Sequence, residues 1–505
     1  MQIFSREQIR AWDEYTITNE PVSKLDLMER AAKACYDWLM GNDFKNRSFT
    51  FFCAKGNNGG DGLALARMLA QSDYTVKVFI LEFGTLGTDE FQFNLVQLHH
   101  EKVAIKFIST EETLSTIDKN DIVIDALLGS GINRPIEGLT AVVIEHINQS
   151  GNQVISIDIP SGLYPERSSK NNTIIRATHT LSFQCYKLAF MMAENEIFIG
   201  QVHVLDIGLH LDFPSTISSS LKIIDSNFVV PLLKKRRKFS HKGDFGHVAL
   251  LAGSKGMMGA AVLCARAIIR SGAGKLTCHV VSSGINIMQT SVPEAMCKEE
   301  EGDDFIKSIG DLEKYQAIAI GPGIGKQETH AALITKVFQS NKPMVIDADA
   351  LNTIAANPEL LLKINRGAIV TPHPGEFARL FGKTENDFDN IQLALNKSKE
   401  LDIYIVLKGA YTFIATPDGS GFFNTSGNPG MAKGGSGDVL TGIIVGLLAQ
   451  KYEPLHAAAL GVYLHGCAGD FAALRFSQSS MNATDITDHL GDAFNSVSEF
   501  NYFTG

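Results

Sequence analysis

The 505-residue sequence predicts an α/β protein made of two domains. Strand-like apolar runs alternate with helix-like blocks along both halves of the chain, which is the pattern of a parallel sheet with crossover helices. Most glycine clusters directly follow these apolar runs, at the strand ends where open α/β sheets bind their ligands. Each half is long enough to bury a hydrophobic core of its own.

The composition excludes several classes of protein. Hydrophobic residues make up 45% of the chain and charged residues 20%, as in ordinary soluble globular proteins, so extended disorder is excluded. The net charge of −10 argues against broad binding to a nucleic-acid backbone. The seven cysteines are odd in number and no two have CxxC spacing, so we expect neither a disulfide framework nor a cysteine zinc site.

The apolar segments of the chain predict a cytoplasmic protein. The N-terminal segment MQIFSREQIRAWDEY carries charges throughout and lacks the apolar core that is typical of a signal peptide. The longest apolar stretch, roughly 439–450, is too short to span a bilayer. We therefore expect neither a membrane nor a nucleic acid among the partners.

The first half is expected to form a parallel sheet with its helices. A buried strand over 48–54 leads into the turn GNNGGDG, and the segment LALARMLAQ (63–71) then has the composition of a helix. Further apolar runs extend the sheet to a position near Leu209; they lie at 75–81, 121–129, 153–160, 177–183 and 201–209.

A change of composition separates the halves. Residues 211–220 are poor in strong structure formers, and we interpret the basic run 234–238 as a solvated linker or helix end. We place the boundary near 212–225, which gives domains over 1–215 and 225–505. In the second half, strands are expected within 247–254, 275–281, 317–320, 343–350 and 367–376, a hairpin with a DG turn at 403–424, and closing helices at 437–450 and 454–476.

The segment Gly56–Gly62 is the first candidate binding element. Its glycines allow a tight turn, and they let backbone N–H groups approach an anion at the start of the following helix. The segment is neither a Walker A loop nor a GxGxxG fingerprint, so the pattern predicts no more than a candidate phosphate site.

Acidic residues stand at two later strand ends. Asp125 precedes the loop GSGINRP, which offers backbone donors and the cation of Arg134, and Asp158 opens the segment DIPSG. In a doubly wound sheet these strand ends converge on one crevice. Oxygens of Asn58, Asp125 and Ser161 could coordinate a cation, and Asp158 is then left as a general acid or base. Helix capping is the alternative interpretation of such acids.

The strongest single motif is GGSGD at 434–438, directly before an apolar helix. Its amides would form an anion site suited to the charge on a transferring phosphoryl group. Asp438 can accept a proton from a substrate hydroxyl, or it can merely complement the helix dipole, and the residues alone leave both open. Lys408 and Gly409 follow a strand where they could border a nucleotide, and His373 is fixed between two prolines.

At these motifs the chain resembles the bifunctional NAD(P)H-hydrate repair enzymes, in which an epimerase domain is fused to an ADP- or ATP-dependent dehydratase. The segments that resemble the epimerase are LMERAA, GNNGGDG, DALLGSGINRP and IDIPSG. Those that resemble the dehydratase are HKGDFGHVALLAGS, GMMGAA, GPGIG, TPHPGE, LKGAYT and GNPGMAKGGSGDVLTG. The match runs in order through almost the whole chain. It implies a Rossmann-like, doubly wound N-terminal domain and a ribokinase-like α/β C-terminal domain.

The resemblance also implies an activity and its site residues. The first domain would interconvert the R and S forms of hydrated NAD(P)H, and the second would dehydrate the S form with ADP, giving AMP and phosphate. Asp158 and Asp438 would be catalytic, K⁺ would be held by Asn58, Asp125 and Ser161, and Mg²⁺ would accompany the ADP. Contacts with the hydrate in the first domain are implied for Asn57, Asn58, Gly59, Gly60, Asp61, Gly129, Ser130, Gly131, Ile132, Asn133, Arg134, Pro135 and Asp158. In the second domain the hydrate would contact Ala261, Gly323, His373 and Asp438, and the nucleotide would contact Lys408, Gly409, Ala410, Tyr411, Thr412 and Gly437.

Two other functions are compatible with the residues. The second domain could be a true kinase of a small alcohol, and the first a non-catalytic binding module. One position departs from the family pattern, because Lys55 stands where many relatives have a glycine next to a proline; its charge could alter the local electrostatics. The expected partners are small molecules (NADHX, NADPHX and ADP), and we expect a homo-oligomer.

Overall fold

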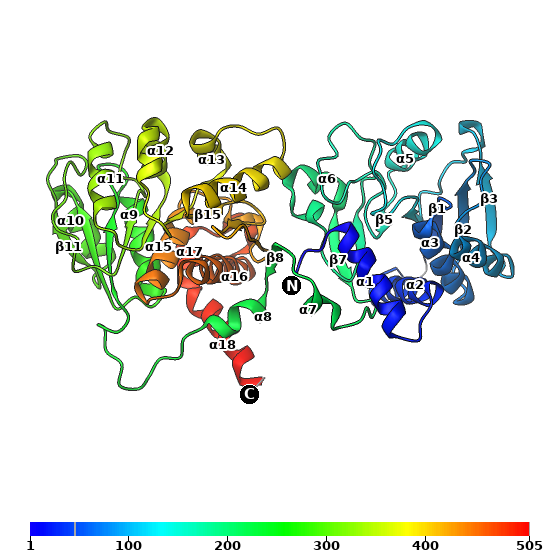
Figure 1. Cartoon of the computed structure of the whole chain (residues 1–505), viewed down its shortest axis with the longest axis horizontal. Coiled ribbons are helices and arrows are strands. Elements are labelled where there is room, and N and C mark those ends of the chain that lie inside the picture. The colour runs from blue at the N-terminus through cyan, green and yellow to red at the C-terminus, as the bar shows by residue number, and fades with distance from the viewer. Residues whose placement is uncertain (45–46, 504–505) are drawn as a thin grey trace. The chain divides into compact units, whose positions relative to one another are not determined.

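The computed structural model describes residues 1–44 and 47–503, which fold into two compact α/β units (Figure 1). The N-terminal unit consists of Gln2–Ser219 with Asn386–Phe388, and the C-terminal unit takes Met1, Ser220–Glu385 and the chain from Asp389 onward. The predicted α/β class is confirmed. The predicted domains, 1–215 and 225–505, both omit the strand 221–224, which pairs within the C-terminal sheet.

Within the described part of the N-terminal unit, seven parallel strands form one sheet in the order β3-β2-β1-β4-β5-β6-β7. The chain moves outward from β1 in one direction and then restarts at β4 on its other side, which is the predicted doubly wound arrangement. The strands are β1 (Ser48–Cys53), β2 (Val76–Leu81), β3 (Ala104–Ile108), β4 (Asp121–Ala126), β5 (Val154–Ile157), β6 (His179–Phe183) and β7 (Gln201–Leu205).

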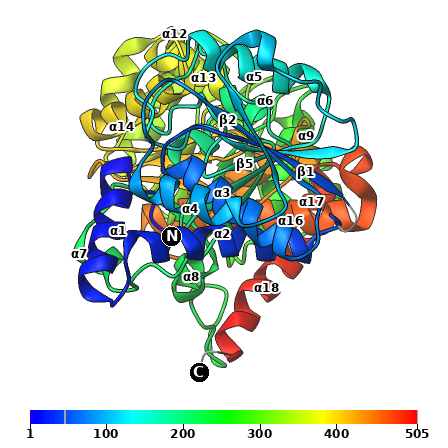
Figure 2. The same ribbon diagram turned by 90° about the vertical axis from the view of Figure 1, so that its right-hand side faces the viewer.

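Helices cover both faces of this sheet. Phe51 packs with α2, α3 and α4 on one face, and its neighbour Phe52 packs with α5 on the other, because successive side chains of a strand point to opposite faces. Figure 2 shows α2, α3 and α4 on one side of the strands and α5 on the other. The helices are α1 (Arg6–Asn19), α2 (Lys24–Gly41), α3 (Asn57–Gln71), α4 (Asp89–His99), α5 (Gly138–Ser150), α6 (Glu196–Ile199) and α7 (Phe213–Thr216), with 3₁₀ turns at Glu111–Thr113, Leu188–Met191 and Ala193–Asn195.

The C-terminal unit is built around a larger sheet. Its described residues supply ten strands in the order β11-β10-β9-β12-β13-β14-β15-β16-β17-β8, parallel except where β16 runs antiparallel to both neighbours. The predicted hairpin is therefore confirmed, and Gly419 makes its DG turn with φ of 84°. The strands are β8 (Leu221–Ile224), β9 (His247–Leu251), β10 (Lys275–Val280), β11 (Met296–Glu299), β12 (Ala317–Ile320), β13 (Met344–Ile346), β14 (Ile369–Val370), β15 (Tyr404–Leu407), β16 (Phe413–Ala415) and β17 (Gly421–Asn424).

The helices that follow these strands place the loops of the second site. They are α8 (Ser226–Val229), α9 (Met258–Arg270), α10 (Ser282–Ser291), α11 (His330–Gln339), α12 (Ala348–Ala356), α13 (Pro374–Phe381), α14 (Asp387–Leu401), α15 (Ser436–Ala449), α16 (Pro454–Ser480), α17 (Ala483–Asp488) and α18 (Leu490–Phe503), with 3₁₀ turns at Val230–Leu232, Pro358–Lys363 and Pro429–Met431. The expectation of two closing helices was wrong, because α17 and α18 follow α16.

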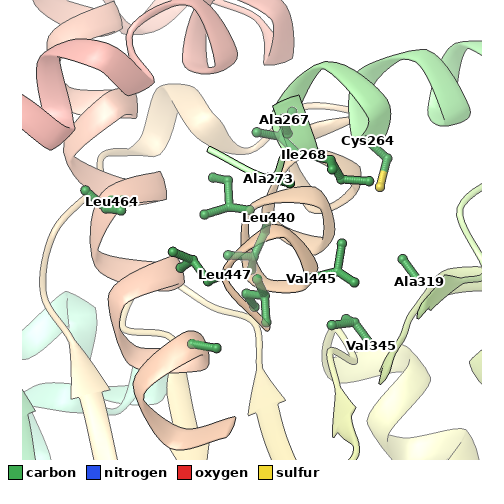
Figure 3. Packing of buried hydrophobic residues seen from close by; sticks show 14 of the residues in the cluster. Cys264, Ala267, Ile268, Ala273, Ala319, Val345, Leu440, Val445, Leu447 and Leu464 are labelled. Atoms are coloured by element: carbon green, nitrogen blue, oxygen red, sulfur yellow. The ribbon is translucent and has the colours of Figure 1, made fainter. Parts of the chain in front are cut away.

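Helix α15 lies at the centre of the C-terminal core. Leu440, Val445 and Leu447 pack among side chains of α9, β12 and β13, as Figure 3 shows. Two glycines of α15 allow this close packing. A Cβ on Gly442 would lie 2.4 Å from the carbonyl oxygen of Cys264, and one on Gly446 would lie 2.0 Å from Ser271 Oγ.

Helix α16 corrects the expectation about apolar stretches. With 27 residues and a mean hydropathy of 1.2 over its most apolar window, it is long and apolar enough to cross a membrane by length and composition. In the structure, 61% of that window is buried, and its residues Leu460 and Leu464 belong to the core around α15.

Candidate active sites

The turn after β1 begins a helix earlier than predicted. Helix α3 starts at Asn57, so the glycines of GNNGGDG form its first turns and not a separate loop. A Cβ on Gly59 would lie 1.7 Å from the carbonyl oxygen of Ala54, and one on Gly62 would lie 2.5 Å from the Cβ of Ala126. These glycines therefore let α3 approach the ends of β1 and β4, and Gly59 and Gly60 are buried against protein.

Asn58 has a side chain that the protein does not satisfy. The residue is 8% exposed, and among the described residues neither its amide oxygen nor its amide nitrogen has a hydrogen-bond partner. A buried amide without partners costs about 1–3 kcal/mol. The side chain lies beside Gly129 of the loop after β4, where an added Cβ would come within 3.4 Å of Asn58 Cγ.

Asp125 and Ser161 form a fully buried pair at the ends of β4 and β5. The Ser161 hydroxyl donates to Asp125 Oδ1 at 2.6 Å, and the Ser161 amide donates to Oδ2 at 2.9 Å. Burial raises the pKa of Asp125 although these hydrogen bonds act to lower it. The pair places a carboxylate and a hydroxyl oxygen, which are possible cation ligands, side by side at the strand ends, as the sequence predicted.

Asp158 directly follows β5 in a strained backbone conformation, with φ of 69°. Its Oδ2 accepts a hydrogen bond from the amide of Ser130 at 2.9 Å, and its Oδ1 lies 2.8 Å from the ammonium nitrogen of Lys187. Burial alone would raise the pKa of Asp158, but Lys187 and the Ser130 donor outweigh it and hold the pKa below its ordinary value.

Two carboxyl groups near Asp158 respond to its charge. Burial, followed by the charge of Asp158, raises the pKa of Asp13 to about 7 and raises that of Asp61 well above its usual range. Asp13 comes from α1, and Arg6 of the same helix approaches the loop after β4 at Gly131. Around Asp158 the unit therefore combines one ionised carboxylate with acids that favour the neutral form.

The rest of the first predicted site is more open. Ile132 is half-buried, whereas Gly131, Asn133, Arg134 and Pro135 are exposed on the loop after β4. The ammonium of Lys55 does not reach this loop. It lies 2.6 and 2.7 Å from the two carboxylate oxygens of Glu82 and donates to the carbonyl oxygen of Thr85, so its charge is compensated.

In the C-terminal unit, Asp347 joins two of the strand ends. It follows β13, is 1% exposed, and accepts hydrogen bonds from Lys408 Nζ at 2.8 Å and from Thr441 Oγ1 at 2.7 Å. Lys408 also lies 4.0 Å from Glu376 Oε2, and a Cβ on Gly437 would come within 3.2 Å of its ammonium nitrogen. Lys408 is thus held against the start of α15.

Asp438 lies in the first turn of α15, after Gly435 has turned the chain with φ of 93°. Burial raises the pKa of Asp438 to about 7, and the nearby charge of Asp347 acts in the same direction while Lys408 opposes it. A carboxyl group with this pKa near neutrality can accept a proton in its ionised form.

A Ser–His pair supports the same turn. The hydroxyl of Ser436 and Nε2 of His465 on α16 lie 3.3 Å apart, both buried. Burial lowers the pKa of His465 to about 4, so the imidazole is neutral at pH 7.

The remaining predicted residues of the second site differ in exposure. His373 caps α13 and is half exposed, with its Nε2 3.5 Å from Glu376 Oε1. Gly323 has φ of 62° and is half-buried, whereas Ala261 is completely buried in α9. The segment after Lys408 is open: Gly409 and Ala410 are exposed, and Tyr411 and Thr412 are half-buried.

Sequence reasoning missed Lys187, Asp13 and Asp347. Lys187 lies four residues after the sixth strand and Asp347 directly after β13, so the position at a strand end could have indicated both. Asp13 stands in an N-terminal helix, where no local pattern marks it. Among residues 1–44 and 47–503, no group of three or more His, Cys, Asp or Glu side chains is arranged to hold a metal ion.

Comparisons with known proteins match both units. Residues 24–189 match the family described as YjeF-related protein N-terminus, and residues 248–491 match the family described as NAD(P)H-hydrate dehydratase. The bifunctional NAD(P)H-hydrate repair enzyme of Moorella thermoacetica is 36% identical over 460 residues, which cover 88% of this chain and 87% of that protein. The enzyme of the same description from Thermofilum pendens is 32% identical over 514 residues, with 99% and 97% covered.

A solved structure is similar to the second half of the chain. It is described as an ADP/ATP-dependent NAD(P)H-hydrate dehydratase from Bacillus subtilis co-crystallised with ATP and Mg²⁺. It is 32% identical, covers 55% of this chain and 98% of its own, and has a TM-score of 0.47.

Proposed function

The chain belongs to the family of bifunctional NAD(P)H-hydrate repair enzymes, and from this premise we propose which residues carry its two reactions. The N-terminal unit is the epimerase and the C-terminal unit the dehydratase of hydrated NAD(P)H. One observation supports the assignment of residues: each unit holds a half-buried carboxyl group near a lysine. Asp158 pairs with Lys187, whereas the charge of Lys408, which pairs with Asp347, acts on Asp438.

For the epimerase, we propose that Asp158 exchanges a proton with the substrate hydroxyl. The hydrated ring carries this hydroxyl on the carbon beside the ring nitrogen, so the centre is hemiaminal-like and opens or dehydrates with acid–base help. The amide of Ser130 and the loop after β4 would position the dinucleotide. Asn57, the exposed first residue of α3, would face its anionic groups.

We also propose a K⁺ site formed by Asn58, Asp125 and Ser161. The unpartnered amide of Asn58 supports it, because its buried oxygen needs a partner that the described protein atoms do not provide. Amide, carboxylate and hydroxyl oxygens are the donors that hard cations prefer. When bound, K⁺ would compensate negative charge beside the strand ends.

For the dehydratase, we propose a phosphorylated intermediate formed with ADP. Asp438 takes the proton of the substrate hydroxyl as the oxygen attacks the terminal phosphorus of ADP, and AMP leaves. Amides of the 434–437 turn and Lys408 stabilise charge on the transferring phosphoryl group. The ring nitrogen then expels phosphate, and loss of a proton from the neighbouring carbon restores NAD(P)H. Mg²⁺ would enter with the nucleotide, whose phosphate oxygens are its usual ligands.

The function is tested with a mixture of both NADH-hydrate epimers, ADP, Mg²⁺ and K⁺, followed by absorbance in the reduced-nicotinamide band. Complete conversion to NADH is expected, because epimerisation feeds the dehydratase. Conversion that stops at the fraction of one epimer would contradict the epimerase assignment. ADP consumption with a stable phosphate ester and no NADH would identify a kinase, an alternative that the relatives do not favour.

A further inference from the structure

The ammonium group of Lys187 has all three of its N–H donors engaged in the N-terminal site. Lys187 is 2% exposed, and its Nζ lies 2.8 Å from Asp158 Oδ1, 3.1 Å from the Asp158 carbonyl oxygen and 2.7 Å from Ser182 Oγ. The Ser182 hydroxyl donates its own proton to the carbonyl oxygen of Cys185, so it can only accept from the lysine. A buried ammonium stays charged only where such partners replace water.

The same contacts fix Asp158 in two ways. The backbone of Asp158 has a positive φ of 69°, a conformation that is strained for a residue with a side chain. Lys187 bonds both the carbonyl oxygen and the carboxylate of this residue, and the Asp158 amide donates to the Leu181 carbonyl oxygen. One carboxylate oxygen is thus taken by the lysine, while Oδ2 faces Ser130 and Gly129 of the glycine loop.

The charges around Asp158 also favour its ionised form. Asp13 and Asp61 approach it from α1 and α3, but desolvation and the charge of Asp158 hold both toward their neutral forms. Lys187 is therefore the opposite charge that compensates the Asp158 carboxylate. Such a separation of neighbouring carboxyl groups into one ionised and others neutral is typical of acid–base sites.

We propose that Lys187 is a positioning residue that holds Asp158 as a carboxylate base, so that epimerisation proceeds by opening of the hydrated ring. This inference rests on the proposed epimerase function of Asp158. Lys187 acts through Asp158 and needs no contact with the substrate.

The reaction then balances without any added reagent. Asp158 takes the hydroxyl proton, the oxygen forms a carbonyl with its carbon, and the bond from this carbon to the ring nitrogen breaks. The electron pair of that bond goes to the nitrogen, which takes a proton from water. After the aldehyde has rotated, the nitrogen adds to its opposite face and loses the proton, and Asp158 returns a proton to the oxygen. The alternative route protonates the hydroxyl, loses it as water and adds water to the other face of the ring.

The two routes differ in the fate of one oxygen atom. Ring opening keeps the original oxygen on the substrate, whereas the water route replaces it with an oxygen of the solvent. The test therefore uses the wild-type chain with one purified NADH-hydrate epimer, no ADP, and water enriched in ¹⁸O. The product epimer is analysed by mass spectrometry after short times, with an enzyme-free sample as the control for spontaneous exchange.

Retention of the original oxygen is the expected result. One solvent oxygen for each epimerisation would overturn the proposal while leaving the epimerase function intact. Absence of epimerisation by the wild-type chain would instead contradict the proposed function itself, so the two failures are distinguishable.

Variants test the role of Lys187 directly. Lys187→Met keeps the length of the side chain and removes its charge, and we expect kcat for epimerisation to fall on the order of 100-fold with little change in KM. Lys187→Arg restores a cation, and its kcat for epimerisation should be at least tenfold higher than that of Lys187→Met. Lys170→Met, at an exposed lysine of the same unit, is the matched control. Thermal unfolding of each variant, compared with that of the wild-type chain, reports whether the N-terminal unit has folded.

The pH profile separates positioning from mere structural support. With Lys187 present, Asp158 is ionised throughout pH 6–8, so its own titration should add no rise of kcat with pH in this range. In Lys187→Met, burial and the carboxyl groups of Asp13 and Asp61 would raise the pKa of Asp158, so kcat should rise with pH across this range. A Lys187→Met enzyme with the wild-type kcat and a flat profile would overturn the proposal. If this variant does not fold, the ¹⁸O measurement on the wild-type chain decides.

Discussion

The ammonium nitrogen of Lys408 lies 2.8 Å from Oδ1 of Asp347, a carboxylate buried between β13 and α15. The other oxygen of Asp347 accepts a hydrogen bond from Thr441, which belongs to α15. Asp347 therefore links the lysine that follows β15 to the helix that carries Asp438. The relative positions of the proposed cation and the proposed base depend on this one buried side chain.

Replacement of Asp347 by Asn should impair the dehydratase. The ion pair is lost while the volume is kept, so Lys408 is no longer fixed beside the start of α15, and we expect kcat for dehydration to fall about 10- to 100-fold. The matched control is Thr441→Val, which removes only the second hydrogen bond and should have a smaller effect. Steady-state dehydration of the S epimer measures both, and equal rates for Asp347→Asn and wild type would contradict the linking role.

Dehydration should depend on pH through Asp438. This carboxyl must be ionised to accept a proton, and its pKa is raised to about 7, so kcat should rise from pH 6 to pH 8 and then level off. Lys408 lowers the pKa of Asp438, so Lys408→Met should move the midpoint to higher pH. In Asp438→Asn the remaining activity should be very low and independent of pH across this range. If kcat of this variant still rose with pH as much as that of the wild type, another group would be responsible for the pH dependence.

Asp158→Asn should separate the two activities of the chain. We expect epimerisation to fall by roughly 100-fold or more, since an amide cannot take the hydroxyl proton. Dehydration of pure S epimer should keep the wild-type rate, because Asp158 belongs to the other unit. Chromatography of the two epimers measures the first reaction and NADH absorbance the second. Unchanged epimerisation by a folded variant would remove Asp158 from the mechanism.

The glycines of the first turn of α3 should differ strongly in their tolerance to substitution. A Cβ on Gly59 would lie 1.7 Å from a backbone oxygen, so Gly59→Ala must displace α3 from β1 and should lower the free energy of unfolding by at least 1–3 kcal/mol. A Cβ on Gly56 meets nothing within 4 Å, and Gly56→Ala serves as the matched control. Denaturant unfolding of both variants tests the difference, and comparable stability would mean that the helix can relax.

Buried parallel strands were the part of the fold that the sequence predicted best. They are continuous apolar runs closed by glycine or proline, as β1, β4 and β12 illustrate. Strand β3 was not predicted because its apolar run is short and interrupted by Lys106, and most of its residues are exposed at the edge of the sheet. The start of α3 was placed too late because glycines have low helix propensity, whereas here close packing requires them.

The positions of the candidate site residues could be predicted where these residues follow a strand or form a glycine turn. Asp125 and Ser161 meet as predicted because the parallel strands that precede them end at one edge. Lys187 and Asp13 could not be found in this way, since their relation to Asp158 exists only after β6 and α1 have packed around β5. The pKa of Asp438 likewise depends on Asp347, which lies 91 positions earlier in the chain.

The two glycines of α15 that meet α9 have a consequence for phosphoryl transfer. Gly442 and Gly446 let the helix pack so closely against Cys264 and Ser271 that even a methyl group at either position would collide, and such close packing resists movement of the helix. The amides at its first turn are therefore preorganised, and they need not rotate toward the developing charge as solvent water would. The energy needed to orient these dipoles is therefore spent when the chain folds and not during the reaction. The glycine contacts that hold them lie about two helical turns along α15 from the amides.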